Sequence, residues 1–202
     1  MADTNPNARF ETFCDGVFAI ALTLLVIEIK VPNPETIGST RDLWLALEHL
    51  GPLFFAFLLS FAIILITWVN HHRFFKLVGR SSSAFLYANG FLLLTVVFMP
   101  FPTALAGEYL MTDHAAPAVV IYNSVTAVQA IGWILVSGAV LRQRLAKDEK
   151  SFGLVRDAHR NGYVAFGVYA LLALLALWFP LTIAVLTTVL WTYWLAFSLR
   201  AE

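Results

Sequence analysis

A single carboxylate, Asp15, lies inside the first apolar run of the sequence, Thr12 to Ile29. An ionisable side chain within a segment of this kind is costly to bury, so it marks either a functional site or a satisfied structural acceptor. A second polar group closes the next apolar run, where Asn70, His71 and His72 stand together. A carboxylate and two imidazoles are the side chains that proton transfer and metal binding use most often.

The geometry of a helix argues against a metal site at the two histidines. Successive residues of a helix point about 100° apart, so His71 and His72 are poorly placed to hold one ion together. We therefore expect no fixed metal and no cofactor. Instead, we expect Asp15 to be met by Arg9, Asn70 or a histidine, which would remove most of the cost of burying its charge. This interpretation makes the cluster structural, tying the first helix to the second.

Four other residues of the first run share one narrow stripe when the run is drawn as a helix: Ile20, Thr23, Leu24 and Ile27. Asp15 lies roughly 140° away from Ile20 by the same arithmetic. The stripe is large and aliphatic, with one hydroxyl. From periodicity alone it fits ordinary helix packing or the lining of a narrow pore.

The elements that must position these residues are membrane helices. The 202 residues are 59% hydrophobic and only 13% charged, whereas soluble domains carry about 25% charged residues. A spanning helix needs roughly 20 apolar residues. We predict an all-α integral membrane protein in which residues 1–202 form a single domain of six transmembrane helices. The expected spans are Thr12–Ile29, Leu50–Val69, Ala84–Met99, Ala118–Leu141, Tyr163–Phe179 and Leu181–Leu199, with Pro100 ending or kinking the third.

Charge predicts the orientation of these helices. All but two of the 13 Lys and Arg residues fall at the termini or in two stretches that we expect to be loops, His71–Ser83 and Arg142–Asn161; the exceptions are Lys30 and Arg41. Basic residues accumulate on the cytoplasmic side of membrane proteins. Six spans place both stretches and both termini on that side. The formal net charge of zero argues against nucleic acid as a partner.

Two motifs add a family resemblance. The first helix opens with Arg9-x-x-x-Phe13-Cys14-Asp15, and the second ends with Trp68-x-Asn70-His71-His72. This combination resembles the signature of the transmembrane-protein-175 family of potassium channels. Cys14 stands where the family motif has serine, and a thiol is a weaker hydrogen-bonding group than a hydroxyl.

The resemblance implies a bacterial, single-repeat channel that assembles as a homotetramer in the bacterial plasma membrane, with the first helix of each subunit lining the pore. It places the constriction at Ile20, potassium preference at Thr23, and further aliphatic layers at Leu24 and Ile27. Potassium would be the permeating ion, and no enzymatic activity is expected. The sequence contains no Thr-Val-Gly-Tyr-Gly filter, so a ring of hydrophobic side chains takes the place of backbone carbonyls.

Two other classes of function were compared with the channel. A proton-coupled secondary transporter would use Asp15 and the histidines as a proton relay, although the sequence shows no inverted repeat or pair of broken helices. An intramembrane enzyme would use His71 and His72, but no second histidine cluster accompanies them.

Overall fold

The computed structural model describes residues 7–200, and the side chains of residues 7–196. The all-α prediction is confirmed: this part of the chain forms eight α-helices and two short 3-10 helices. In chain order they are α1 (Ala8–Leu24), η1 (Leu25–Glu28), η2 (Pro34–Thr36), α2 (Thr40–His49), α3 (Gly51–Phe75), α4 (Ser83–Phe98), α5 (Pro100–Tyr109), α6 (Ala115–Arg142), α7 (Glu149–Leu175) and α8 (Pro180–Arg200).

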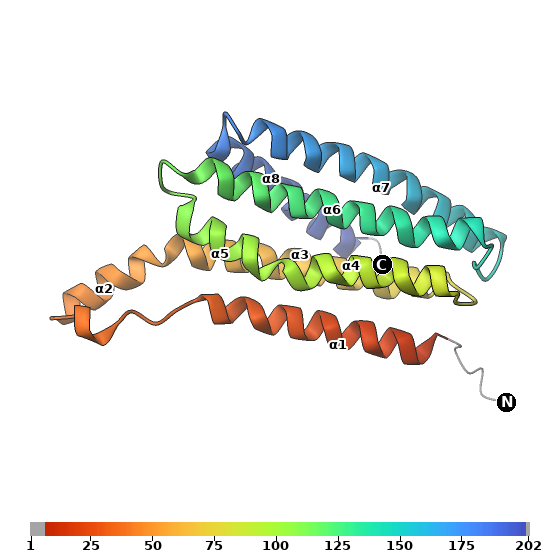
Figure 1. Ribbon diagram of the computed structural model, residues 1–202, viewed down its shortest axis with the longest axis horizontal. Helices are drawn as coiled ribbons and strands as arrows, with labels where there is room; N and C mark the ends of the chain where they lie inside the picture. Colours follow the sequence, from red (N-terminus) through yellow and green to blue (C-terminus); the bar gives the residue numbers. More distant parts are fainter. Residues whose placement is uncertain (1–6, 201–202) are drawn as a thin grey trace.

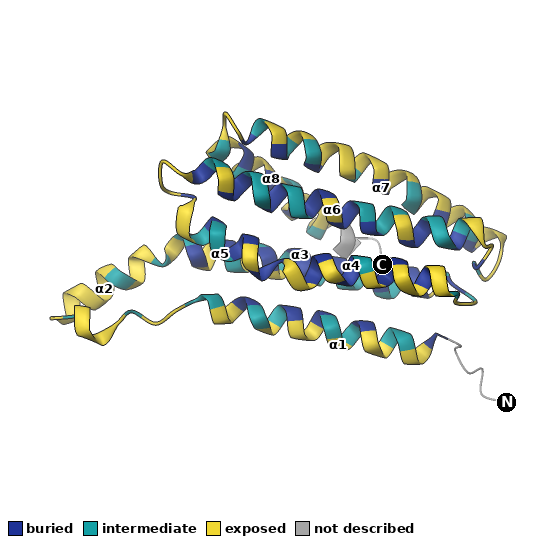
Figure 2. Cartoon of the chain, in the orientation of Figure 1, coloured by how far each residue is buried: buried dark blue, intermediate teal, exposed yellow. Residues whose placement is uncertain are grey.

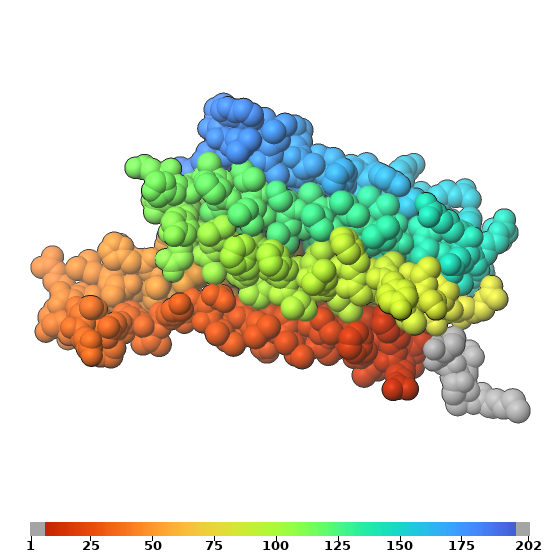
Figure 3. Space-filling model, viewed as in Figure 1, coloured from red at the N-terminus to blue at the C-terminus, as the bar shows by residue number. Residues whose placement is uncertain are grey.

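The long helices run side by side along the longest axis of the molecule (Figure 1). Helix α1 packs only at the edge of the bundle, against α3 and α4, while α6 joins α4 to α7. In the space-filling view α1 forms the outermost layer on its side (Figure 3). Its far side therefore has no neighbour in the part of the chain that the structure describes.

Four helical stretches are long and apolar enough to cross a bilayer: Ala8–Glu28, Gly51–Phe75, Ser83–Tyr109 and Ala115–Arg142. Pro180–Ala196 of α8 is apolar but shorter. Helix α7 has the length, with 27 residues, but its first half is charged. The count of six spans thus stays a prediction. Length and apolarity establish four of them but not the fifth and sixth, which correspond to α7 and α8.

Among the expected boundaries that differ from the observed ones, one concerns residues singled out in the sequence. Helix α3 continues to Phe75, so Asn70, His71 and His72 lie inside the helix instead of just beyond it. The prediction that the third helix is interrupted at Pro100 is confirmed: α4 ends at Phe98, and a separate helix, α5, begins at Pro100 and continues in nearly the same direction (Figure 1). Proline is well tolerated at the start of a new helical segment, where its missing N–H has no partner to lose.

The stretch Arg142–Asn161 was expected to be a loop, and this is wrong. Helix α7 begins at Glu149, because Asp148 caps it: the Ser151 N–H donates to Asp148 Oδ1 at 2.7 Å. Hydrogen bonding from Ser151 holds the pKa of the Asp148 carboxyl below its usual value. The first half of α7 carries many charged residues. A search for long apolar segments therefore assigns it to a loop, although it is helical.

The turn between α3 and α4 and the turn between α6 and α7, both rich in Lys and Arg, meet at one end of the bundle. They are called the two basic turns below. Val78 and Ala146 form a short antiparallel bridge, in which the Gly79 N–H donates to the Leu145 carbonyl at 2.8 Å. Asn7 joins them, because its Nδ2 donates to the Val78 carbonyl at 3.3 Å. The start of α1 and both basic turns therefore share one end of the molecule, as the charge pattern requires.

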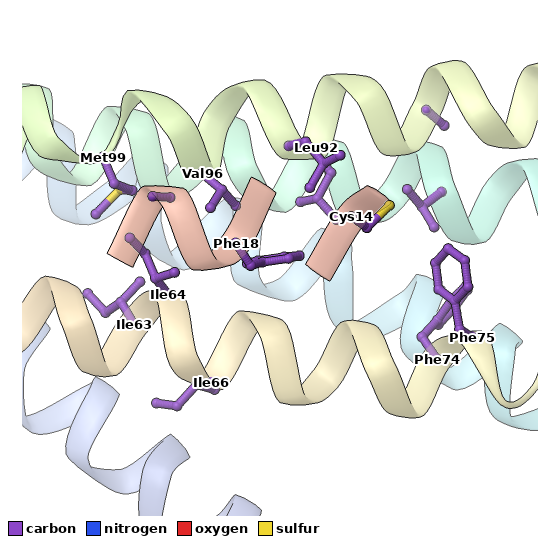
Figure 4. Close-up of a cluster of buried hydrophobic side chains, with 14 of the residues drawn as sticks. Cys14, Phe18, Ile63, Ile64, Ile66, Phe74, Phe75, Leu92, Val96 and Met99 are labelled. Carbon is purple, nitrogen blue, oxygen red and sulfur yellow. The ribbon is translucent and has the colours of Figure 1, made fainter. Parts of the chain in front are cut away.

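The bundle core is built where α1 meets α3 and α4 (Figure 4). Side chains from the three helices interdigitate there: Cys14, Phe18, Ile63, Ile64, Leu92 and Val96, all fully buried. Lipid tails are as apolar as these side chains, so close packing rather than exclusion of water stabilises the contact in a membrane. At the other end α5 closely approaches α3, and a Cβ added to Gly107 would lie 2.8 Å from Leu53 Cα.

Candidate functional site: the first helix and its support

Helix α1 has one packed side and one open side. Its buried residues are Cys14, Phe18 and Ala21, and Leu25 of η1 continues the same stripe. The spacing of four, three and four residues is that of a single helix face. Cys14 and Phe18 point toward α3 and α4 (Figure 4), while the opposite side of α1 is exposed along its length (Figure 2).

The four residues of the aliphatic stripe lie on or beside that open side. Ile20 is 58% exposed and Ile27 64% exposed; Thr23 is exposed and Leu24 half-buried. Large apolar side chains left open in this way need another surface against them, whether lipid, a second subunit or a dewetted pore. The described residues of the chain do not supply that surface.

The hydroxyl of Thr23 has a fixed orientation. Its Oγ1 donates to the Ile20 carbonyl at 2.8 Å. This bond uses the single hydroxyl proton and leaves the oxygen lone pairs for another partner. Thr23 therefore presents an acceptor oxygen, one turn from Ile20, on the open side of α1.

Asp15 finds a partner that the sequence analysis did not consider. The indole Nε1–H of Trp68 donates to Asp15 Oδ1 at 2.8 Å. The expected partners were Arg9, Asn70 or a histidine; Arg9 and Asn70 are exposed, and the two neighbouring histidines of α3 bind other side chains. A neutral donor therefore replaces the cation, and the carboxylate is stabilised by a charge-assisted hydrogen bond.

A second polar link lies one turn away. His72 Nδ1 is 3.1 Å from Glu11 Oε1, and the His72 ring stacks on Trp68 with centroids 6.2 Å apart. Glu11 and Asp15 are four residues apart on α1, as are Trp68 and His72 on α3, so two parallel links join the helices. The sequence analysis missed Glu11; its spacing of four from Asp15 was the available signal.

His71 belongs to a different contact. It is fully buried, and its Nε2 lies 3.0 Å from Asn89 Oδ1 on α4. The Asn89 amide donates to the Phe85 carbonyl at 2.8 Å, which turns Oδ1 toward the ring and makes His71 Nε2 the donor. His71 thus ties α3 to α4 while His72 ties α3 to α1. Asn89 was not identified from the sequence.

The remaining motif residues have packing roles. Phe13 is exposed and stacks on Phe10 at 6.1 Å between centroids. Cys14 lies in the apolar core, and its sulfur makes no hydrogen bond to any described residue. Across residues 7–200, no three His, Cys, Asp or Glu side chains come together in a group that could hold a metal ion.

The fold and this site define a class: a polytopic helical membrane protein whose first helix is braced by a polar cluster and leaves an apolar face open. The family model described as the endosomal/lysosomal potassium channel TMEM175 matches residues 9–100. A solved structure, a lysosomal potassium-selective channel TMEM175 homologue from Chamaesiphon minutus, superposes with a TM-score of 0.81 at 38% identity. The match covers 95% of this chain and 97% of that one.

The chain therefore belongs to the TMEM175 family. A potassium channel of Chamaesiphon minutus is 50% identical over 129 residues, which are 64% of this chain and 63% of the relative. The matched stretch thus spans somewhat less than two thirds of the length of that curated relative. The human endosomal/lysosomal proton channel TMEM175 is 38% identical over 81 residues, 38% of this chain and 16% of that protein.

Proposed function

We propose that the chain is one subunit of a homotetrameric, potassium-permeable channel whose pore is lined by α1. The observation that carries the proposal is the open face of α1, where Ile20, Thr23 and Ile27 are exposed although two of the three are large and apolar. Copies arranged around a symmetry axis would bring these faces together. Named relatives that are potassium channels support the ion.

In this arrangement four Ile20 side chains meet at one level and form the narrowest ring. Branched aliphatic groups offer no oxygen to replace the hydration of an ion, so this ring is the main barrier and can gate by dewetting. Thr23 supplies an acceptor oxygen one turn away, and Leu24 and Ile27 continue the apolar lining. Selectivity then depends on pore radius and the Thr23 oxygens instead of fixed charge.

The topology follows from the same proposal. With α7 and α8 completing six spans, both termini and the two basic turns lie on the cytoplasmic side of a bacterial plasma membrane. The bridge between Val78 and Ala146 supports a common side for the two turns.

The rival proton-coupled transporter is less well supported. Its relay would run through Asp15, but Asp15 is held by the neutral Trp68 indole on the side of α1 that faces α3. A coupled transporter gives saturable flux that depends on a proton gradient, whereas a channel gives ohmic current under a potassium gradient alone.

Cysteine accessibility tests the pore assignment, because the chain's single cysteine, Cys14, is buried. We expect that Ile20→Cys, in a Cys14→Ala background, reacts with a membrane-impermeant, water-soluble thiol reagent and that the reaction reduces potassium current. Leu58→Cys on α3 is the matched control, because Leu58 is 63% exposed against 58% for Ile20. Equal protection of both thiols would place Ile20 in lipid and overturn the proposal.

A further inference from the structure

A cleft opens at the far end of α1, beside the last layer of the stripe. It has a volume of about 330 Å³ and lies between η1 and the junction of α4 with α5. Its walls are mostly apolar, and Leu24 and Ile27 belong both to the cleft and to the stripe. The cleft therefore borders the path proposed for the ion.

One charged group enters this apolar cleft. Glu28, the last residue of η1, is half-buried and lines the wall. Throughout the described chain its carboxylate has no hydrogen bond or ion pair; Lys30, two residues on, is exposed and does not pair with it. A carboxylate partly withdrawn from water and left without a counter-charge attracts a cation.

Two aromatic rings complete the cleft. Phe98 and Phe101 both line it, and their ring centroids are 5.3 Å apart. Aromatic faces attract cations, and quaternary ammonium groups are recognised by aromatic walls of this kind. A hydrated potassium ion would have to give up water to contact a ring, whereas a quaternary ammonium group is weakly hydrated, so the combination of carboxylate, rings and apolar volume favours an organic cation over an inorganic one.

The surrounding charge points the same way. The end of the bundle that holds the cleft is acidic, with only two basic residues, Lys30 and Arg41, along the connection to α3. Its acidic residues are Glu28, Glu35, Asp42, Glu48, Glu108 and Asp113. This excess of negative charge raises the local concentration of cations near the cleft.

We propose that this cleft is a binding site for monovalent organic ammonium ions, with Glu28 as the counter-charge and Phe98 and Phe101 as the aromatic wall. The inference rests on the proposed function in one respect: occupancy should block potassium current, because Leu24 and Ile27 belong to both the cleft and the ion path. The binding itself depends only on the subunit.

The test uses phenyltrimethylammonium, whose cationic nitrogen and single ring match the cleft. Binding to the purified full-length protein in detergent is measured by titration calorimetry, and block is measured in bilayers with the ion added to one side at a time. We expect Glu28→Gln to weaken binding about tenfold, since it removes the charge and keeps the shape. Glu35→Gln, at another acidic residue of the same end, is the control and should bind as the parent does.

A second variant guards against a folding defect in the first. Phe101→Leu keeps apolar bulk and removes one ring, so it should weaken the binding of phenyltrimethylammonium about threefold to fivefold. Block should occur from only one side of the bilayer.

The outcomes separate the site from the channel. No binding to the parent, or equal binding by the parent and Glu28→Gln, overturns the site and indicates that lipid or a neighbouring subunit fills the cleft. Glu28-dependent binding to a protein that carries no potassium current leaves the site standing and refutes the proposed function. Binding with block of the parent current supports both.

Discussion

The contact between Trp68 and Asp15 gives the sharpest test of how α1 is held. Trp68→Phe removes the Nε1–H that donates to Asp15 Oδ1 at 2.8 Å and keeps a ring to pack beside α1. Asp15 is half-buried, so water only partly replaces the lost donor. We expect a loss of stability without a change of fold.

The magnitude follows from the kind of bond. A hydrogen bond to a charged group contributes about 1.5–3 kcal/mol, so we expect Trp68→Phe to lower the free energy of unfolding by about 2 kcal/mol per subunit. For a chain of 150–250 residues this corresponds to a decrease in Tm of about 4–8 °C. Asp15→Asn keeps an acceptor oxygen and loses the charge, so its effect should be about half as large.

The assay is thermal unfolding of the purified protein in mild detergent, followed by intrinsic fluorescence. Trp44→Phe is the control, because Trp44 lies on α2 and is 69% exposed; its Tm should match the parent. The double variant Trp68→Phe with Asp15→Asn should be no less stable than Trp68→Phe alone, since Trp68→Phe has already removed the bond that Asp15→Asn weakens.

Two results would refute this reasoning. If Trp68→Phe is as stable as the parent while Asp15→Asn is not, the carboxylate is held by another partner. If the two changes add in full, they act on separate contacts. A changed ion preference in Asp15→Ala with normal assembly would instead move Asp15 from a structural role to the ion path.

Three further outcomes are expected. Ile20→Asn should raise single-channel conductance and lower potassium-over-sodium preference in matched solutions, because it wets the narrowest ring; unchanged values would exclude Ile20 as the constriction. Thr23→Ala should lower the preference with less effect on conductance, since it removes an acceptor oxygen but little bulk. Gly107→Ala should destabilise by about 1–3 kcal/mol in thermal unfolding, because its Cβ would lie 2.8 Å from Leu53 Cα. Gly90→Ala is its control, as nothing lies within 4 Å of that Cβ, and a loss of similar size there would refute the steric argument.

Helical periodicity determined which residues of α1 share a face. The positions of Ile20 and Thr23 relative to Asp15 depend only on the rotation per residue, which every α-helix shares; Ile27 follows in the 3-10 helix η1. The structure places these three on the open side of α1 and Asp15 against α3. That the open side lines a pore is still a prediction, because a single subunit does not show what covers it.

Composition and charge were informative at the level of segments. Apolar runs located α1, α3, α4 and α6 because each is long and nearly free of charge. The same rule failed for α7, whose charged first half is helical. Its buried residues Ser151, Val155 and Gly162 recur at four and seven residues, so the helix is amphipathic there, and amphipathic helices do not register as apolar runs.

Only the tertiary structure decided the partners between helices. The sequence placed Asp15 near the end of α3 but offered Arg9, Asn70 and a histidine equally, while the structure selects Trp68. It also separates His71, which meets Asn89, from its neighbour His72, which meets Glu11. Periodicity fixes the direction in which a side chain points around the axis of its own helix. The tilt, the depth and the relative rotation of two helices follow from how all their side chains interdigitate, and these decide which atoms come within hydrogen-bonding distance.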